Sequence, residues 1–144
     1  MTRAPGLLPV LVPVLLAGLL ACGSRSPEAQ VHAAFEACRA AVEAGDAAGA
    51  TGPLDTTFLG PEGMNKATAR LFLEGTLRQE QVGITVLHDQ IQVRGNEAGQ
   101  DVVLLLTSRG GGLLPQEASR RGFHLRWRRV SGSWRLLELE AQQQ

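Results

Sequence analysis

The hydrophobic pattern of this chain changes its period once, between Arg78 and Val82, and this change constrains the fold most. Before it, apolar residues recur every three or four positions, as on one face of a helix; after it, they alternate as on one face of a strand. Helices followed by a run of strands indicate an α+β domain. The sequence therefore predicts N-terminal helices packed on an antiparallel sheet of about four strands.

The first helix is predicted over the segment SPEAQVHAAFEACRAAVEAGD. Ser26 is a favourable N-cap, Pro27 suits the first helical position, and Gly45 can end the helix. A short second helical turn is expected to begin at Asp46. The apolar face of the first helix is expected to carry Val31, Phe35, Cys38 and Val42. Cys38 on this face is interpreted as a buried thiol that packs as a small hydrophobe.

A longer helix is predicted to open at Pro61 and Glu62 and to end near Arg78. The segment before this helix is expected to be a short, irregular strand. Its apolar side chains Phe58 and Leu59 are expected to pack inward. The buried side of the helix is expected to consist of Met64, Ala67, Leu71 and Phe72.

The strands begin at Val82, and their alternation changes phase after His88, which predicts a β-bulge or bend near Asp89. The segment GNEAG is predicted to be the first hairpin turn. A later segment, GGGLLPQEAS, is interpreted as a loop in which Leu113 and Leu114 cover the mouth of a pocket.

The strand register of the last hairpin can be deduced from the positions of its charged residues. A two-residue turn at 131–132 would place Leu125 opposite Glu138 and mix charge with core. A three-residue loop over 131–133 separates the two kinds of residue, because one face becomes apolar and the other ionic. We therefore predict that loop, with the pairs Trp127–Leu137, Leu125–Leu139, Arg126–Glu138 and His124–Glu140.

The chain opens with MTRAPGLLPVLVPVLLAGLLAC, one early positive charge followed by an uncharged apolar run and small residues. This is the tripartite pattern of an export signal. The run is shorter than the about 20 residues of a membrane-spanning helix, and Pro9 and Pro13 interrupt it. The segment is therefore expected to be a signal peptide over residues 1–21.

The signal ends in LLAC, which resembles the lipobox of bacterial lipoprotein precursors. The resemblance implies that Cys22 becomes the first residue of the mature chain and carries a thioether-linked diacylglycerol. Residues 22–26 would then be a lipidated tether, and residues 27–144 a single domain. Since Gly23 follows the cysteine rather than aspartate, the resemblance also implies the outer membrane, with the domain facing the periplasm. The alternative is an ordinary cleaved signal that leaves Cys22 as a structural thiol.

The order of elements and two segments point to a known superfamily. AVEAGDAAGA closes the first helix, and LRWRRVSGSWRLLELE ends the chain with two strands and paired tryptophans. These resemble the nuclear transport factor 2-like (NTF2-like, also SnoaL-like, cystatin-like α+β) superfamily. The resemblance implies a strongly curved sheet that wraps around helices to form a cone. The superfamily contains isomerases, dehydratases and hydrolases as well as binding domains without chemistry.

Enzymatic residues are sparse. Members that resemble ketosteroid isomerase use a tyrosine, and this chain has none. Members that resemble scytalone dehydratase pair histidine with carboxylate, which leaves four weak candidates in the sequence: His88, Asp89, Asp101 and His124. His88 and Asp89 are neighbours, so on a regular strand they point to opposite faces. A polar surface bend is the preferred interpretation. His32 is expected to be solvated.

No cofactor is predicted, and three scattered histidines without ligand spacing predict no metal site. The formal net charge is zero, and an exported lipoprotein rarely meets nucleic acid, so no nucleic-acid partner is expected. Six arginines nevertheless cluster near the end of the chain, between two acidic positions: Arg120, Arg121, Arg126, Arg128, Arg129 and Arg135. They could bind an anionic phospholipid or envelope polymer. The preferred alternative is a solvated strand face with the tryptophans in the core.

Two functions remain open. The first is a non-enzymatic, membrane-tethered domain that binds a small apolar or amphiphilic ligand in its cone, or a protein partner, including a second copy, through its outer sheet face. The second is a hydrolase or dehydratase that uses a His–carboxylate pair in the cone. The direction of Asp89, Asp101 and His124 discriminates between them, because an enzyme needs two of these groups inside a cavity.

Overall fold

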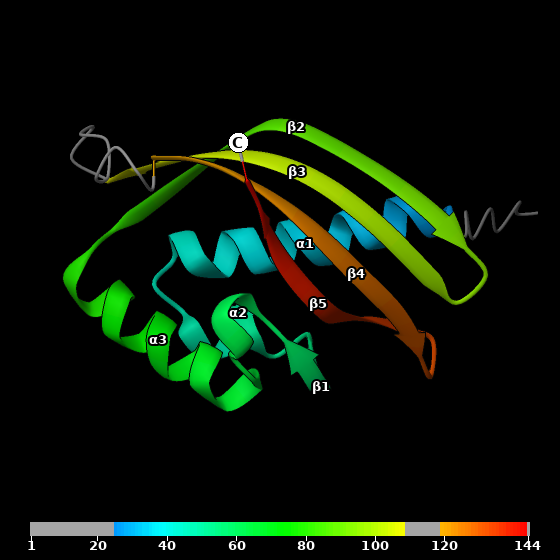
Figure 1. Cartoon of the computed structure of the whole chain (residues 1–144), viewed down its shortest axis with the longest axis horizontal. Coiled ribbons are helices and arrows are strands. Elements are labelled where there is room, and N and C mark those ends of the chain that lie inside the picture. The colour runs from blue at the N-terminus through cyan, green and yellow to red at the C-terminus, as the bar shows by residue number, and fades with distance from the viewer. Residues whose placement is uncertain (1–24, 109–118, 144) are drawn as a thin grey trace, which may run out of the picture.

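A computed structural model describes residues 25–108 and 119–143 of the chain, and its fold is α+β as predicted. The curved sheet, with strand order β1-β5-β4-β3-β2, arches over α1, and α2 and α3 lie beyond α1 (Figure 1). The elements in chain order are α1 (Pro27–Glu43), α2 (Ala47–Thr51), β1 (Leu54–Leu59), the 3₁₀ turn η1 (Pro61–Gly63), α3 (Lys66–Gln79), β2 (Val82–Arg94), β3 (Glu97–Ser108), β4 (Arg120–Val130) and β5 (Ser133–Gln142).

The first helix begins and ends, and the second begins, where the sequence predicts. The Ser26 side chain accepts a hydrogen bond from the Ala29 amide at 3.2 Å, and the Asp46 carboxylate accepts one from the Gly49 amide at 2.8 Å. Between the helices, Gly45 has a φ of 74°, which is the left-handed conformation that ends a helix. Local capping residues therefore account for both boundaries.

The start of α3 differs from the prediction. Pro61 and Glu62 form a separate turn, because Glu62 has a φ of 57° and Gly63 a φ of 76°, and neither can continue a right-handed helix. The helix begins instead after Asn65, whose side chain accepts a hydrogen bond from the Thr68 amide at 2.9 Å in a capping box.

The predicted buried side of α3 is also wrong. Leu71 and Phe72 are 67% and 59% exposed, Ala67 is exposed, and only Ala69 within the helix is buried. The helix contacts α2 and β1 but does not lie on the concave face of the sheet, and the side that it turns inward contains Ala69 with the half-buried Leu73 and Leu77. Met64 precedes the helix and is half-buried.

The four predicted strands are β2 to β5, and β1 adds a fifth that runs parallel to β5, with Leu54 beside Leu136. The β2–β3 turn consists of residues 95–96. A bulge lies between Val86 and His88, close to the predicted bend. The bulge sets the face onto which the second half of β2 directs its side chains.

The β4–β5 hairpin has a two-residue turn, so the predicted three-residue loop is wrong. Ser131 and Gly132 adopt φ values of 50° and 79°, which suit a tight hairpin, and Val130 pairs with Ser133. An irregularity between Arg126 and Trp127 then shifts the register by one residue. Because of it, the pairs Leu125–Leu139, Arg126–Glu138 and His124–Glu140 form as predicted, whereas Trp127 faces Leu136 instead of Leu137.

The hydrophobic core fills the space between α1 and the concave face of the sheet. Trp127 and Val31 are fully buried, and Val102 is 1% exposed. Among the residues that the structure describes, the cluster of buried residues runs from Val31 on α1 to Leu136 on β5. A chain that begins at Gly23 therefore retains the whole cluster. The core consists of Val31, Phe35, Leu54, Phe58, Ala69, Ala98, Val102, Leu104, Leu125, Trp127, Trp134 and Leu136.

Candidate functional site

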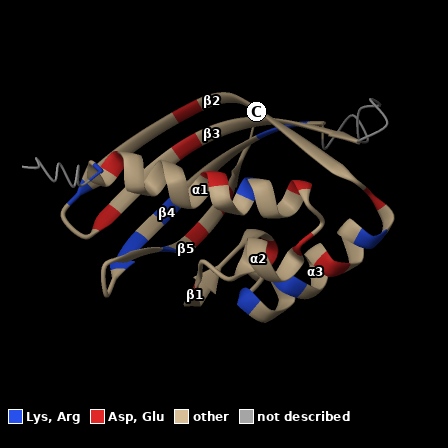
Figure 2. Cartoon of the chain, turned by 180° about the vertical axis from the view of Figure 1, so that it is seen from behind, with Lys and Arg blue, Asp and Glu red and all other residues tan. Residues whose placement is uncertain are grey.

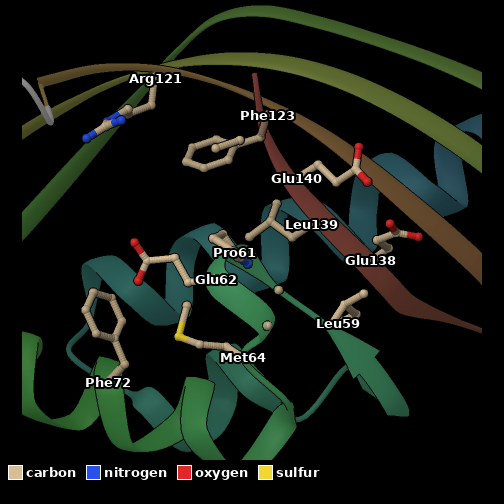
Figure 3. Close-up of a pocket in the computed structure, with 13 residues that line it drawn as sticks. Leu59, Pro61, Glu62, Met64, Phe72, Arg121, Phe123, Glu138, Leu139 and Glu140 are labelled. Carbon is tan, nitrogen blue, oxygen red and sulfur yellow. The ribbon is translucent and has the colours of Figure 1, made fainter. Parts of the chain in front are cut away.

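One end of the concave space stays open as a cavity of about 870 Å³ between η1, the first turns of α3, and the outer ends of β4 and β5 (Figure 3). Most of the residues that line the cavity are apolar, and four of them are charged. The lining residues are Leu59, Gly60, Pro61, Glu62, Gly63, Met64, Phe72, Arg121, Phe123, Glu138, Leu139, Glu140 and Ala141.

Strand pairing explains why the upper wall of the cavity is apolar. Phe123 lies opposite Val102 on one side and Ala141 on the other, and Leu139 lies opposite Leu125. Paired residues of neighbouring strands share a face, so Phe123 and Leu139 project to the same side as the buried Val102 and Leu125. The cavity is thus a continuation of the core, left unfilled at one end.

The lower wall depends on a tight passage of the chain. A Cβ atom at Gly60 would lie 2.9 Å from the Phe58 ring, so glycine is required for the chain to pass over it. Two residues later, Glu62 holds a left-handed backbone conformation that is unfavourable for a side-chain-bearing residue, by about 1 kcal/mol. This passage carries Glu62 and Met64 to the cavity.

The charges around the cavity are unequal. Glu138 pairs with Arg126 at 3.0 Å, so its charge is balanced. Figure 3 shows Arg121 and Glu62 on one side of the cavity, whereas the carboxylates of Glu138 and Glu140 lie beyond β5 and point away from the cavity. The cavity therefore combines an apolar wall with charged groups of both signs, an arrangement suited to a ligand with an apolar body and a polar end.

Two of the predicted histidine–carboxylate candidates do come together, but on the outer face. His124 Nδ1 lies 2.8 Å from Asp101 Oδ1, and their side chains are 43% and 47% exposed. Gln142 donates a further hydrogen bond to the same carboxylate oxygen at 2.9 Å. None of these residues lines the cavity. His88 is exposed, and it lies on the face opposite to Asp89, as predicted.

Asp89 instead points toward α1, where it accepts hydrogen bonds from two partners. His32 Nδ1 lies 3.0 Å from one carboxylate oxygen, and Gln100 Nε2 donates to the other at 2.8 Å. Gln100 Oε1 in turn accepts a hydrogen bond of 2.9 Å from the indole of Trp127. A continuous polar chain thus runs from the half-exposed His32 to the fully buried Trp127.

The sequence did not reveal this polar chain. His32 was expected to be solvated, and it lies 57 residues from Asp89, so no local pattern links the two. Gln100 carried a usable signal, because it alternates with Ala98 and Val102 on the buried side of β3. A glutamine in an otherwise apolar row of a strand requires partners in the core.

The six arginines do not form one patch, because strand alternation and different partners separate them. Arg126 pairs with Glu138, and Arg128 lies 3.1 Å from the buried Asp55. Arg121 reaches the cavity, whereas Arg120, Arg129 and Arg135 are exposed. Both tryptophans pack in the core. Arg126 thus lies on an exposed strand face beside Glu138, whereas Arg128 is half-buried and paired with a buried carboxylate.

Asp55 has the most perturbed carboxyl group of the described residues. Hydrogen bonds from the Thr57 amide and hydroxyl, with a further contribution from Arg128, lower the pKa of Asp55 to about 2. The carboxylate lies on β1, so this network ties β1 to β4 across β5. It is a structural group, since it does not line the cavity.

The remaining candidates add no chemistry within the described part of the chain. Burial raises the pKa of the Cys38 thiol to about 11, as expected for a packed thiol. No group of three or more His, Cys, Asp or Glu side chains there could hold a metal, and no helix is long and apolar enough to span a membrane. Cys22, Leu113 and Leu114 lie outside the described residues.

Comparison with known proteins identifies structural neighbours only. No family model matches the chain, and no curated protein matches it. A Mycobacterium tuberculosis protein of unknown function is similar at 14% identity and a TM-score of 0.69, covering 79% of this chain and 69% of the other.

Two further solved structures carry informative descriptions. A Pseudomonas putida protein described as NTF2-like is 13% identical with a TM-score of 0.65, covering 80% of this chain and 84% of the other. A Streptomyces avermitilis protein described as a dehydratase of the NTF2-like family is 18% identical with a TM-score of 0.65. The match covers 79% of this chain and 93% of the other. Similarity at these identities shows the fold.

Proposed function

We propose that this domain, which has the NTF2-like, cystatin-like fold, binds one small amphiphilic ligand in the cavity between η1, α3 and the β4–β5 hairpin. The cavity itself is the observation that carries the proposal. Its volume of about 870 Å³ falls in the range of small-molecule sites, about 300–1,000 Å³. Its apolar wall would stabilise a bound hydrocarbon by about 0.8 kcal/mol for each buried CH₂.

The positions of the histidines favour binding over catalysis. A general base must reach its substrate within hydrogen-bond distance, about 3 Å. His124 and Asp101 are on the convex face, and His32 and Asp89 lie between α1 and β2; none of the four lines the cavity. A ligand in the cavity would therefore meet no histidine base.

The test uses two adjacent residues of α3 as a matched pair. Phe72 lines the cavity, whereas Leu71 is equally exposed but does not line it. Neither belongs to the core cluster, so both should tolerate truncation. With 8-anilinonaphthalene-1-sulfonate as the probe, Phe72→Ala should weaken binding several-fold, since an aromatic contact is lost, and Leu71→Ala should leave it unchanged. Equal effects of the two substitutions on probe binding would contradict the proposal, as would a wild type that does not bind the probe saturably.

Native mass spectrometry on the chain purified from its host provides the complementary measurement. A retained small-molecule mass that disappears on denaturation, and is reduced in Phe72→Ala, supports the ligand site. A dimer without bound ligand would instead favour the other partner considered above, a protein docked on the outer face of the sheet.

A hydrolase or dehydratase is the second candidate, favoured by the His124–Asp101 pair at 2.8 Å and by the Streptomyces neighbour described as a dehydratase. It would require a substrate bound at the convex face, where His124 borders only a shallow depression of about 170 Å³. His124→Gln should abolish any hydration or hydrolysis of the ligand recovered by mass spectrometry. A ligand that is never turned over, by wild type or variant, contradicts this candidate.

The proposed setting is a lipid anchor at Cys22 in the bacterial envelope, on the periplasmic side of the outer membrane. The lipobox-like LLAC segment supports it, as does the start of α1 at Pro27, which leaves a tether of about 17 Å for five extended residues. Cys22→Ser should release the protein from the membrane fraction and remove the lipid mass. Unchanged membrane association and mass in this variant would contradict the anchor.

A further inference from the structure

A second pocket, of about 540 Å³, lies at the end of the domain where α1 begins. It is formed by Arg25, by one side of α1 from Gln30 to Ala37, by the segment between α2 and β1, and by the β4–β5 turn with the strand ends beside it. In Figure 1 the start of α1 and the tips of both hairpins lie at the same end of the molecule. The indole of Trp134 belongs to its wall and donates a hydrogen bond of 3.2 Å to Gln30 Oε1.

Three arginines from three separate segments line this pocket, and no acidic residue does. Arg25 lies before α1, Arg129 is the last residue but one of β4, and Arg135 follows Trp134 on β5. Arg135 donates a hydrogen bond to the Gly52 carbonyl at 3.3 Å, which holds its guanidinium beside the pocket. Within residues 25–108 and 119–143, no ion pair neutralises any of the three.

The charges elsewhere on the molecule differ in their surroundings. Among the described residues, Arg78, Arg94 and Arg121 also lack an ion pair, but each lines a pocket that contains an acidic residue as well. Arg126, Arg128, Arg39 and Arg70 each pair with a carboxylate. In Figure 2 basic positions of β4 and β5 lie at the end of the domain where α1 begins, and others on β4 lie at the opposite end. The three arginines of the pocket thus form an uncompensated cationic site. Guanidinium groups bind phosphate with two parallel hydrogen bonds, so the chemistry is that of a phosphate receptor.

We infer that the pocket of Arg25, Arg129 and Arg135 binds the phosphate of an anionic phospholipid headgroup in the membrane that holds the chain. The choice of a membrane rests on the proposed anchor, because Arg25 is three residues from Cys22 and must lie near the bilayer if Cys22 is acylated. The binding chemistry does not rest on the ligand cavity, which is a separate site.

The inference also assigns the domain an orientation relative to the bilayer. Arg129 and Arg121 lie near opposite ends of β4, eight residues apart, which corresponds to about 26 Å along a strand. With the pocket of Arg25, Arg129 and Arg135 on the bilayer, the cavity beside Arg121 is directed away from it. The amphiphile of the proposed function would then exchange with the aqueous side.

The experiment uses the chain from Gly23 to Gln144, which lacks Cys22 and retains the whole core. Its sedimentation with phosphatidylcholine vesicles is measured with and without phosphatidylglycerol, at low and high salt. We expect binding that requires phosphatidylglycerol and is lost at high salt. Arg129→Gln and Arg25→Gln should each weaken it about fivefold, from about 1 kcal/mol for each basic residue near a charged surface.

The matched control is Arg120→Gln, which removes the same charge at the other end of β4. It should leave vesicle binding unchanged. An equal loss in Arg120→Gln and Arg129→Gln would show general attraction and overturn the site, as would binding that ignores salt. Binding of soluble glycerol 3-phosphate without any vesicle binding would overturn the membrane as its source. Phe72→Ala, which tests the cavity, should bind vesicles like the wild type, so the two proposals fail separately.

Discussion

Gln100 shows how one polar side chain can organise a core. It is fully buried, and its amide satisfies both the indole N–H of Trp127 and one oxygen of Asp89. Each of these groups would otherwise lose its hydrogen bond in a dry environment. The glutamine therefore fixes the rotamer of the largest core residue and the direction of Asp89 on β2.

Replacing this amide should be costly. Gln100→Leu keeps the volume but leaves the Trp127 indole unsatisfied in the core, so the free energy of unfolding should fall by about 2 kcal/mol. Urea titration followed by tryptophan fluorescence measures it. Gln90→Leu, at an exposed position on β2, is the control and should change stability by less than about 0.5 kcal/mol. Equal stability of Gln100→Leu and wild type would contradict this role.

Asp55 makes stability depend on pH. Its pKa is about 2 in the folded protein against an ordinary value of 3.8, so ionisation favours folding. That contribution is complete above about pH 4 and is lost as the pH falls through 2.

Asp55→Asn should lower the free energy of unfolding by about 2 kcal/mol at pH 7, and the gap to wild type should narrow as the pH approaches 2. Urea titrations across this range measure the gap. Glu97→Gln, at an exposed position, should show little difference at any pH. A gap for Asp55→Asn that does not vary with pH would exclude the carboxylate's charge as its cause.

Among the elements, α3 departs most from the expectation based on its hydrophobic pattern. Its apolar residues Leu71 and Phe72 are exposed, and the helix is held by its capping box and by contacts with α2 and β1. It turns inward the face of Ala69, Leu73 and Leu77 instead of the predicted face of Ala67, Leu71 and Phe72. The exposed side of this element is available to form the cavity mouth through Phe72.

The two leucines Leu71 and Leu125 test this placement. Leu71→Ala removes an exposed side chain from a helix and should change the free energy of unfolding by less than about 0.5 kcal/mol. Leu125→Ala removes a side chain that is 4% exposed and should cost about 2–5 kcal/mol. A loss of 2 kcal/mol or more in Leu71→Ala would mean that α3 packs by the face predicted from the sequence.

The whole molecule places its two proposed sites at opposite ends of one curved sheet. The core occupies the space between them, from Val31 on α1 to Leu136 on β5, and both tryptophans belong to it. The amphiphile cavity is the part of the concave space that this core leaves open. Sheet curvature, supported by the bulge in β2 and the irregularity in the last hairpin, gives the space its depth.

A single core predicts a single unfolding transition. The chain from Gly23 to Gln144 should unfold in one step, with coincident curves from tryptophan fluorescence and far-ultraviolet circular dichroism. Two separated transitions would show that α2, β1 and α3 unfold independently of β2 to β5, and would contradict one cooperative core.

Local chemistry determined much of this protein from the sequence. Capping residues and apolar periods read over a few residues predict both ends of α1, the start of α2, the strands β2 to β5, the bend near Asp89 and the burial of both tryptophans. The lipid anchor at Cys22 stays a prediction. The NTF2-like resemblance, carried by the terminal hairpin, identified the fold that the solved neighbours share.

Tertiary structure decided everything that depends on distant partners. The sequence could not place His32 beside Asp89, Arg128 beside Asp55, or Arg25 beside Arg129, because each pair is separated by more than fifty residues and joined only when the sheet curves over α1. The hairpin shows the same limit at short range: the charge pairs were predicted correctly, but a tight turn with a register shift replaced the longer loop. Side-chain alternation determines which residues share a face of the sheet. The backbone geometry of the turn and of the register shift determines how the two strands bring those residues together.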